Sequence, residues 1–180
     1  PAGDLLFPVR LPKGPFGYNQ GTCEGGFGCR ELYLYNPATG TLACVSCGPA
    51  GTHAIAGAEL SAYAVQGGIQ KDYHQNTALA TSGRVFFNTP EALVAEDTNG
   101  VTDPYEYDPA TGRVRLLSTG DSPSPSYFLD ASADGSDVFI DTNQALVGWD
   151  HDGAYDIYDV RSGGGFPEPP PVTAPCNGAS

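Results

Sequence analysis

Two acidic loops of the same spacing hold the residues best suited to chemistry in this chain. One loop runs from Asp97 to Asp103 and the other from Asp150 to Asp156, each with a central glycine. Alternating oxygen ligands around a glycine turn are typical of calcium loops. The spacing therefore predicts calcium as a cofactor, bound by six oxygen-bearing side chains: Asp97, Asn99, Asp103, Asp150, Asp152 and Asp156.

A structural role for these loops is the stronger interpretation. A full calcium loop would place its first carboxylate at Ala95 and Gly148, and neither residue can supply a ligand. Asp and Asn side chains also bond to the backbone two residues ahead, in Asx turns where glycine accepts a positive φ. We therefore expect turns first and calcium second.

Four cysteines lie close together in the first quarter of the chain: Cys23, Cys29, Cys44 and Cys47. They predict two disulfides, paired either locally or across strands through Cys29 and Cys47. Zinc is the alternative, but five residues separate the first two cysteines where a zinc knuckle has two to four. Disulfides indicate an oxidising compartment, while Cys176 has no evident partner in this chain.

A redox role for the Cys44–Cys47 pair is not expected from the sequence, because no helix start is evident there to lower a thiol pKa. No catalytic residue is assigned either. The three histidines are scattered, and no Gly-x-Ser-x-Gly or His-Glu-x-x-His motif occurs. The alternative function is a secreted carbohydrate-active hydrolase or lyase that uses loop carboxylates at Asp134–Asp137 or Asp150–Asp156.

The elements that position these loops recur along the chain. Residues 85–105 match residues 138–158 without a gap, 53 positions later, with 10 of 21 positions identical. A partial third copy, Tyr33–Gly40, matches Tyr105–Gly112. Such periods, with short β-strands and turns inside each unit, are typical of propellers and similar arrays. Trp149 departs from the repeat, because the first copy has Glu96 there, so we expect a binding contact at Trp149.

Each unit reads as strand, Asp-Gly turn, strand, longer loop, strand, Pro-Ala-Thr-Gly turn, strand. This predicts an all-β fold of propeller-like, four-stranded antiparallel blades, and an incomplete propeller, because a closed one has at least four blades. The one helix candidate is Ala54–Gln66, in an insertion. The expected organisation is an N-terminal segment with a disulfide loop (1–28), blades over 29–162 (29–48 partial, 49–75 insertion, 76–120, 121–162) and a Gly/Pro-rich tail (163–180).

Composition limits the partners. The net charge is −13 with only 8 basic residues, which argues against nucleic acid and anionic membrane surfaces. No apolar run reaches the ~18 residues of a membrane span, so membrane insertion is not expected. The 10 Tyr and 8 Phe suit blade cores first and a carbohydrate-stacking surface second. A chain that begins at Pro1 and contains no Met is expected to be a processed or excised piece.

The stretch Ala92–Asp108, together with Cys29–Tyr35 and Cys44–Cys47, resembles secreted actinobacterial β-propeller proteins of the TolB-like, WD-repeat-like kind. The Gly163–Pro167 segment and the prolines after it also fit. This resemblance covers most of residues 23–176 and implies a propeller that acts as an extracellular or cell-surface binding platform. We therefore expect a binding or structural scaffold module, self-associating through exposed blade edges. Another copy or another protein is the expected partner.

Overall fold

The computed structural model describes residues 3–10, 16–20, 23, 28–50, 52–60 and 76–170. These residues form an all-β structure of three antiparallel sheets with three strands each, and the described part contains no helix. The strands are β1 (Leu5–Val9), β2 (Glu31–Asn36), β3 (Thr41–Cys44), β4 (Val85–Thr89), β5 (Asp103–Asp108), β6 (Arg113–Leu116), β7 (Tyr127–Ala131), β8 (Asp137–Thr142) and β9 (Asp156–Arg161).

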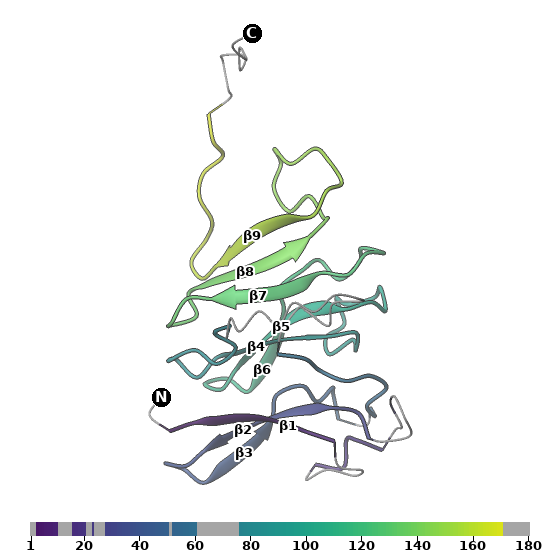
Figure 1. Cartoon of the computed structure of the whole chain (residues 1–180), viewed down its shortest axis with the longest axis vertical. Coiled ribbons are helices and arrows are strands. Elements are labelled where there is room, and N and C mark those ends of the chain that lie inside the picture. The colour runs from purple at the N-terminus through teal and green to yellow at the C-terminus, as the bar shows by residue number, and fades with distance from the viewer. Residues whose placement is uncertain are drawn as a thin grey trace, which may run out of the picture.

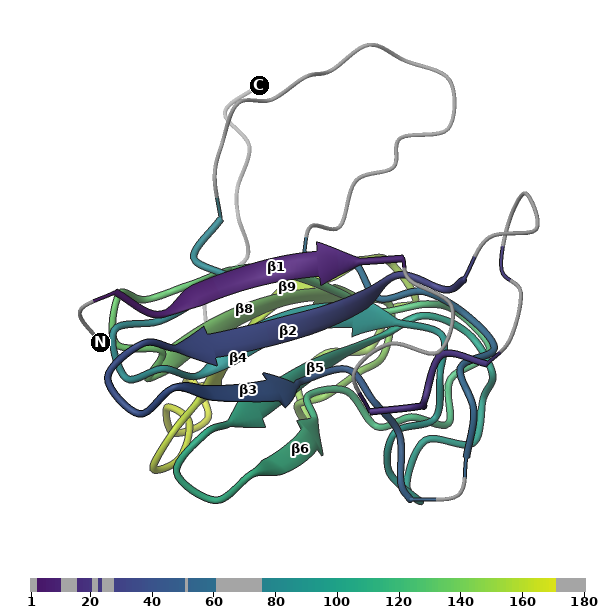
Figure 2. The same ribbon diagram turned by 90° about the horizontal axis from the view of Figure 1, so that it is seen from below.

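The three sheets follow one another along the longest axis of the molecule (Figure 1). Sheet A has the order β1-β2-β3, sheet B the order β4-β5-β6 and sheet C the order β7-β8-β9. Seen from below, the strands of successive sheets overlie one another with their axes roughly aligned (Figure 2). Sheet B therefore lies between the other two, and sheets A and C form the two ends of the described stack.

The Pro-Ala-Thr-Gly turns form as the sequence predicts. The side-chain oxygens of Asn36 and Asp108 each accept the backbone amide two residues ahead, at 2.9 Å in both turns. Gly40 and Gly112 close these turns with φ of 67° and 68°, a region that glycine enters without steric cost. The same local chemistry thus makes the β2–β3 and β5–β6 hairpins.

The core consists of two layers, one on each side of sheet B. Successive side chains of a strand point to opposite faces, and every residue of β4 is buried. Phe87 belongs to the layer shared with Leu32 and Leu34 of sheet A, whereas Phe86 belongs to the layer shared with Phe128 of sheet C. A short β-branched and aromatic run thus serves two interfaces at once.

The predicted four-stranded unit is not observed, because each sheet of the described chain has three strands. The 53-residue repeat aligns β4 with β8 and β5 with β9, so the counterpart of β6 would fall in the tail near residues 166–169. That segment contains prolines, which lack the amide donor that a strand needs. Near the counterpart of β7, the described residues of sheet B form an isolated bridge between Leu79 and Val85.

The N-terminal segment contributes a strand that the repeat does not reveal. β1 pairs with β2 in antiparallel register, with Pro8 opposite Leu32. Proline is tolerated in an edge strand, which is the position of β1 in sheet A. Of the helix candidate, residues 54–60 are described and are not helical, and 61–66 lie outside the described residues, as does Cys176.

Candidate functional site

The two Asp-Gly loops occupy equivalent places, between β4 and β5 and between β8 and β9. In each loop the first aspartate accepts a hydrogen bond from a tyrosine eight residues later. Tyr105 donates its hydroxyl to Asp97, and Tyr158 donates its hydroxyl to Asp150. The repeated Asp and Tyr identities therefore tie each loop to the strand that follows it.

The middle residues of the loops form Asx turns. The Asn99 side-chain oxygen accepts the Val101 amide at 2.9 Å, and the Asp152 side-chain oxygen accepts the Ala154 amide at 2.8 Å. These contacts confirm the turn interpretation. Gly100 has the expected positive φ of 70°, whereas Gly153 of the second loop does not have a positive φ.

The two loops differ at their last aspartate. Asp103 is fully buried and accepts hydrogen bonds from Ser118 at 2.5 Å and from Asn99 at 2.7 Å. Burial raises the pKa of the Asp103 carboxyl, against the opposing effect of these two donors. Its counterpart Asp156 is exposed at the start of β9. The last aspartate of the first loop is thus bonded internally, whereas both Asp152 and Asp156 of the second loop are exposed.

The second loop is where the described structure gathers predicted metal ligands. One carboxylate oxygen each from Asp150, Asp152 and Asp156 lies within 4.8 Å of the others. Hard oxygen ligands of this kind suit calcium. Because two of the three already serve the turn and the tyrosine, calcium at this loop stays a prediction of the sequence.

Trp149 lies beside this loop, and its role as a binding contact stays a prediction of the sequence. It is 42% exposed and lines a surface hollow of about 680 Å³ together with Ile157 and Phe166. Asp150, Asp152 and Asp156 line the same hollow. Apolar side chains and carboxylates therefore share one surface of sheet C.

The tyrosine ties provide a matched test of the repeat. Tyr105 is buried and Tyr158 only partly so, and burial raises the pKa of Tyr158 to about 12. Replacing Tyr105 by phenylalanine should cost about 1–3 kcal/mol of unfolding free energy, because it leaves a buried Asp97 oxygen without its donor. Tyr158→Phe should cost less than about 1 kcal/mol in the same urea titration. Equal costs would contradict the assigned burial of the two loops.

Sequence reasoning missed two buried glutamates, Glu91 after β4 of sheet B and Glu31 in β2 of sheet A. Glu91 accepts hydrogen bonds from the Tyr18 hydroxyl at 2.5 Å and from the backbone amides of Ile55 and Ala56 at 2.5 Å and 2.7 Å. It thereby holds two segments against the end of β4. Gln144 stands at the equivalent position of the next repeat, 53 residues later. The replacement of an acid by an amide between the two copies was the sequence signal that could have singled out Glu91.

Glu31 is the second buried acid, at the start of β2. Its carboxylate accepts the Ser46 hydroxyl at 2.6 Å, as Asp103 accepts that of Ser118. Both pairs are separated by 15 residues and lie 72 positions apart, so the alignment that matches Ser46 with Ser118 could have identified Glu31.

Of the two disulfide pairings that the sequence allows, the structure has the local one. Cys23 bonds to Cys29 with a Cα–Cα distance of 4.8 Å, and Cys44 bonds to Cys47 at 5.5 Å. Both separations are usual for disulfides. A disulfide leaves no thiolate to bind zinc, so this state of the chain does not support a zinc site.

The chain has no significant match to a protein-family model, a curated protein or a solved structure. Among the described residues, no helix has the length and apolar character needed to cross a membrane.

Proposed function

We propose that this chain is an extracellular binding or scaffold module, made of consecutive propeller-like blades of the TolB-like kind, that associates with a second copy of itself. The binding surface is the outer surface of sheet C, defined by Phe139, Trp149, Ile157 and Phe166. All four side chains are among the exposed large hydrophobic residues of the chain. The two disulfides fit an oxidising, extracellular environment.

The observation that carries this proposal is the repeated phenylalanine of β4 and β8. Phe86 has no exposed surface and stacks on Phe128 of the next sheet, with ring centroids 5.5 Å apart. Its counterpart Phe139 is 39% exposed on the far side of sheet C. Phe86 of sheet B packs against the next sheet, so the equivalent Phe139 of sheet C is suited to packing against a further sheet.

The other end of the stack supports the assignment by contrast. Tyr33 of β2 is nearly fully buried because Phe7 and Phe16 stack on it, at centroid distances of 6.1 Å and 6.0 Å. The N-terminal segment thus covers sheet A, as a terminal cap does in a repeat array. In the described chain the outer surface of sheet C has no comparable cover beyond Phe166, which lies against Arg161.

A second copy is the occupant that this chemistry favours. Sheet C is acidic as well as apolar, but Arg161 pairs with Asp137 at 2.7 Å and lies 3.7 Å from Asp159. The apolar side chains of this surface are therefore bordered by one set of ion pairs and by the carboxylates of Asp150, Asp152 and Asp156, and a protein interface likewise has an apolar centre and a polar rim. Two identical surfaces related by a two-fold axis form a closed dimer, the commonest form of self-association.

Charge placed on the surface tests the proposal. Ile157 is 66% exposed on β9, and Ile157→Asp should weaken the dimer at least about tenfold without changing the fold, because burying an unpaired carboxylate is costly. The matched control is Ile55→Asp, at a 79% exposed residue outside sheet C, which should leave the dimer intact. Sedimentation velocity over a concentration series gives both dissociation constants. A monomer at every concentration, or equal effects of both variants, would refute self-association through this surface.

A further inference from the structure

Both cysteines of the Cys44–Cys47 disulfide line one surface hollow, whereas only Cys23 of the neighbouring disulfide lines a hollow. Cys44 is the last residue of β3 and Cys47 follows it; both are partly buried and line a hollow of about 560 Å³ that Tyr18 and His53 also line. Cys29, by contrast, is fully buried in a cluster with Tyr18 and Ala54. A small or protein-bound thiol can therefore approach either sulfur of Cys44–Cys47, but only the Cys23 sulfur of Cys23–Cys29.

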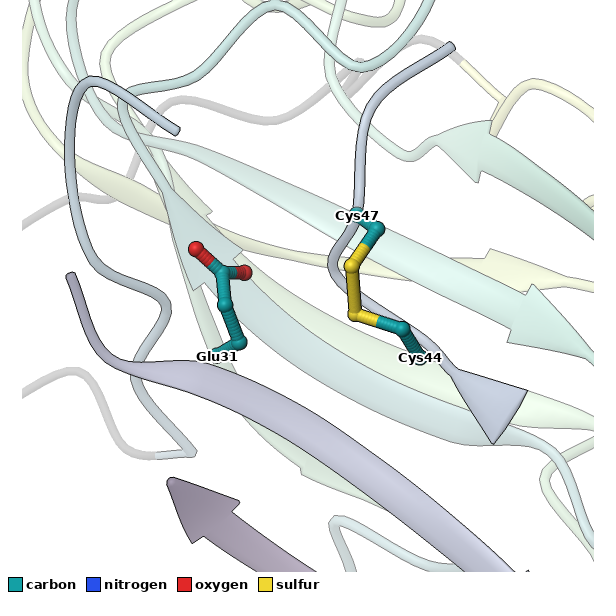
Figure 3. Close-up of side chains that lie close together, drawn as sticks. All are labelled: Glu31, Cys44 and Cys47. Atoms are coloured by element: carbon teal, nitrogen blue, oxygen red, sulfur yellow. A yellow bond between two sulfur atoms is a disulfide. The ribbon is translucent and has the colours of Figure 1, made fainter. Parts of the chain in front are cut away.

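A buried carboxyl group lies beside this disulfide. Figure 3 shows the Glu31 side chain pointing from the start of β2 toward Cys44 and Cys47. One carboxylate oxygen of Glu31 lies within 4.8 Å of both sulfur atoms, and the residue is 1% exposed. At this separation a proton can pass after a small side-chain movement or through one water molecule.

One oxygen of Glu31 has no structural task among the described residues. Ser46 donates to Oε2, whereas the buried Oε1 has no hydrogen-bond partner in the described part of the chain. A buried oxygen in this state is costly for an ionised carboxylate and much less so for a protonated one.

The second unit shows which of these features are repeat structure. There Asp103 and Ser118 reproduce the acid–hydroxyl pair, but Asn99 donates to the other carboxylate oxygen at 2.7 Å. Leu116 and Thr119 stand where the first unit has the two cysteines. The first unit therefore differs by a longer acid, a free oxygen and a disulfide, and these three differences meet at one place.

The protonation state of Glu31 agrees with this geometry. Burial raises the pKa of the Glu31 carboxyl to about 8, Ser46 opposes the rise through its hydrogen bond, and the nearby Glu91 adds to it. At neutral pH the group holds a proton that it can give to a leaving thiolate.

We propose that Cys44–Cys47 is a redox-active disulfide that accepts two electrons from an external dithiol, with Glu31 supplying a proton to the sulfur that leaves. This differs from the usual activation of a Cys-x-x-Cys pair at a helix start. The described chain has no helix there, and the acid acts from the neighbouring strand instead.

The steps balance as ordinary thiol–disulfide exchange. A thiolate of the dithiol attacks one cysteine sulfur, the S–S bond breaks, and the second cysteine leaves as a thiolate that takes the proton of Glu31. The other thiolate of the dithiol then attacks the mixed disulfide, which releases the first cysteine as a thiolate that is protonated from water. The dithiol becomes a disulfide, the cysteines become two thiols, and solvent returns a proton to Glu31.

The test is the rate of reduction of each disulfide by dithiothreitol in the folded wild-type protein. Free thiols are blocked first, new thiols are alkylated at timed intervals, and mass spectrometry of peptides assigns them to Cys44–Cys47 or Cys23–Cys29. We expect Cys44–Cys47 to be reduced at least about tenfold faster than Cys23–Cys29. After correction for the thiolate fraction of dithiothreitol, its rate should fall as the pH rises through about 8. Equal rates for the two disulfides, or a corrected rate independent of pH, would overturn the proposal.

Two variants separate proton transfer from access. Glu31→Gln should slow reduction of Cys44–Cys47 at pH 7 by about tenfold or more and remove the pH dependence. Asp103→Asn alters the equivalent acid of the second unit, which has no disulfide beside it, and should leave the rate unchanged. Similar slowing in both variants would show that the effect does not depend on an acid beside the disulfide, and would refute the role of Glu31. If Glu31→Gln fails to fold, the wild-type pH profile still decides.

Discussion

Replacing Phe86 by alanine should lower the free energy of unfolding by about 3–5 kcal/mol, the cost of emptying a large aromatic site in a core. Phe86 has no exposed surface and joins sheets B and C through its stacking on Phe128. The side chain lies inside the layer that also contains Val138 and Ile140, so its loss opens a cavity between two sheets. Urea denaturation followed by circular dichroism measures the change.

The matched control is the same substitution at the repeat-equivalent position. Phe139→Ala should cost less than about 1 kcal/mol when measured in dilute solution, where the chain is monomeric, because this ring is already 39% exposed. A large cost at Phe139, or a small one at Phe86, would contradict the assignment of sheet C as the end of the stack whose outer ring at Phe139 is exposed among the described residues. The comparison changes only the surroundings, since residue type, strand position and substitution are the same.

The second large effect concerns pH. Burial raises the pKa of Glu31 from its usual 4.5 to about 8, so the folded state binds more protons than the unfolded state between these values. A carboxyl with a raised pKa stabilises the fold fully below the unfolded pKa and loses this contribution as the pH rises through the folded pKa. The wild-type chain should therefore lose about 3 kcal/mol of stability between pH 5 and pH 8.

Glu31→Gln should remove most of this loss, because glutamine keeps the size of the side chain and does not titrate. The exposed Glu96, replaced in the same way, serves as control and should leave the pH dependence as in the wild type. Melting temperatures recorded at pH 5, 6, 7 and 8 give the comparison. A wild-type protein that is equally stable at pH 5 and pH 8 would show that Glu31 is ionised in the folded state.

Local chemistry made much of the fold predictable. Asn36 and Asp108 each stand before a Pro-Ala-Thr-Gly turn and bond to it as expected, and strands follow on both sides. The all-β class follows from these turns and from the repeated runs at Val85 and Val138. The number of strands in each sheet was harder to predict, because a strand needs a hydrogen-bonding partner and the prolines of the tail remove the counterpart of β6.

Some features of the candidate sites could likewise be predicted from the sequence, and others required the structure. The tyrosine ties and Asx turns of the two loops follow from residues that recur at fixed spacing, so a sequence can indicate them. Glu31 could not be assigned a function from sequence, because its relation to Cys44–Cys47 depends on the pairing of Tyr33 with Cys44 across two strands and on burial. Choosing between the two cysteine pairings likewise required three-dimensional proximity.

The proposed binding surface on sheet C can be tested most directly by oxidative footprinting of the wild-type chain. Hydroxyl radicals modify exposed side chains, and mass spectrometry reports each residue at a dilute and at a concentrated protein sample. The account predicts that Phe139, Trp149 and Ile157 become protected in the concentrated sample, while Ile55, which is 79% exposed away from sheet C, does not change. Unchanged oxidation of all four residues at both concentrations would contradict it.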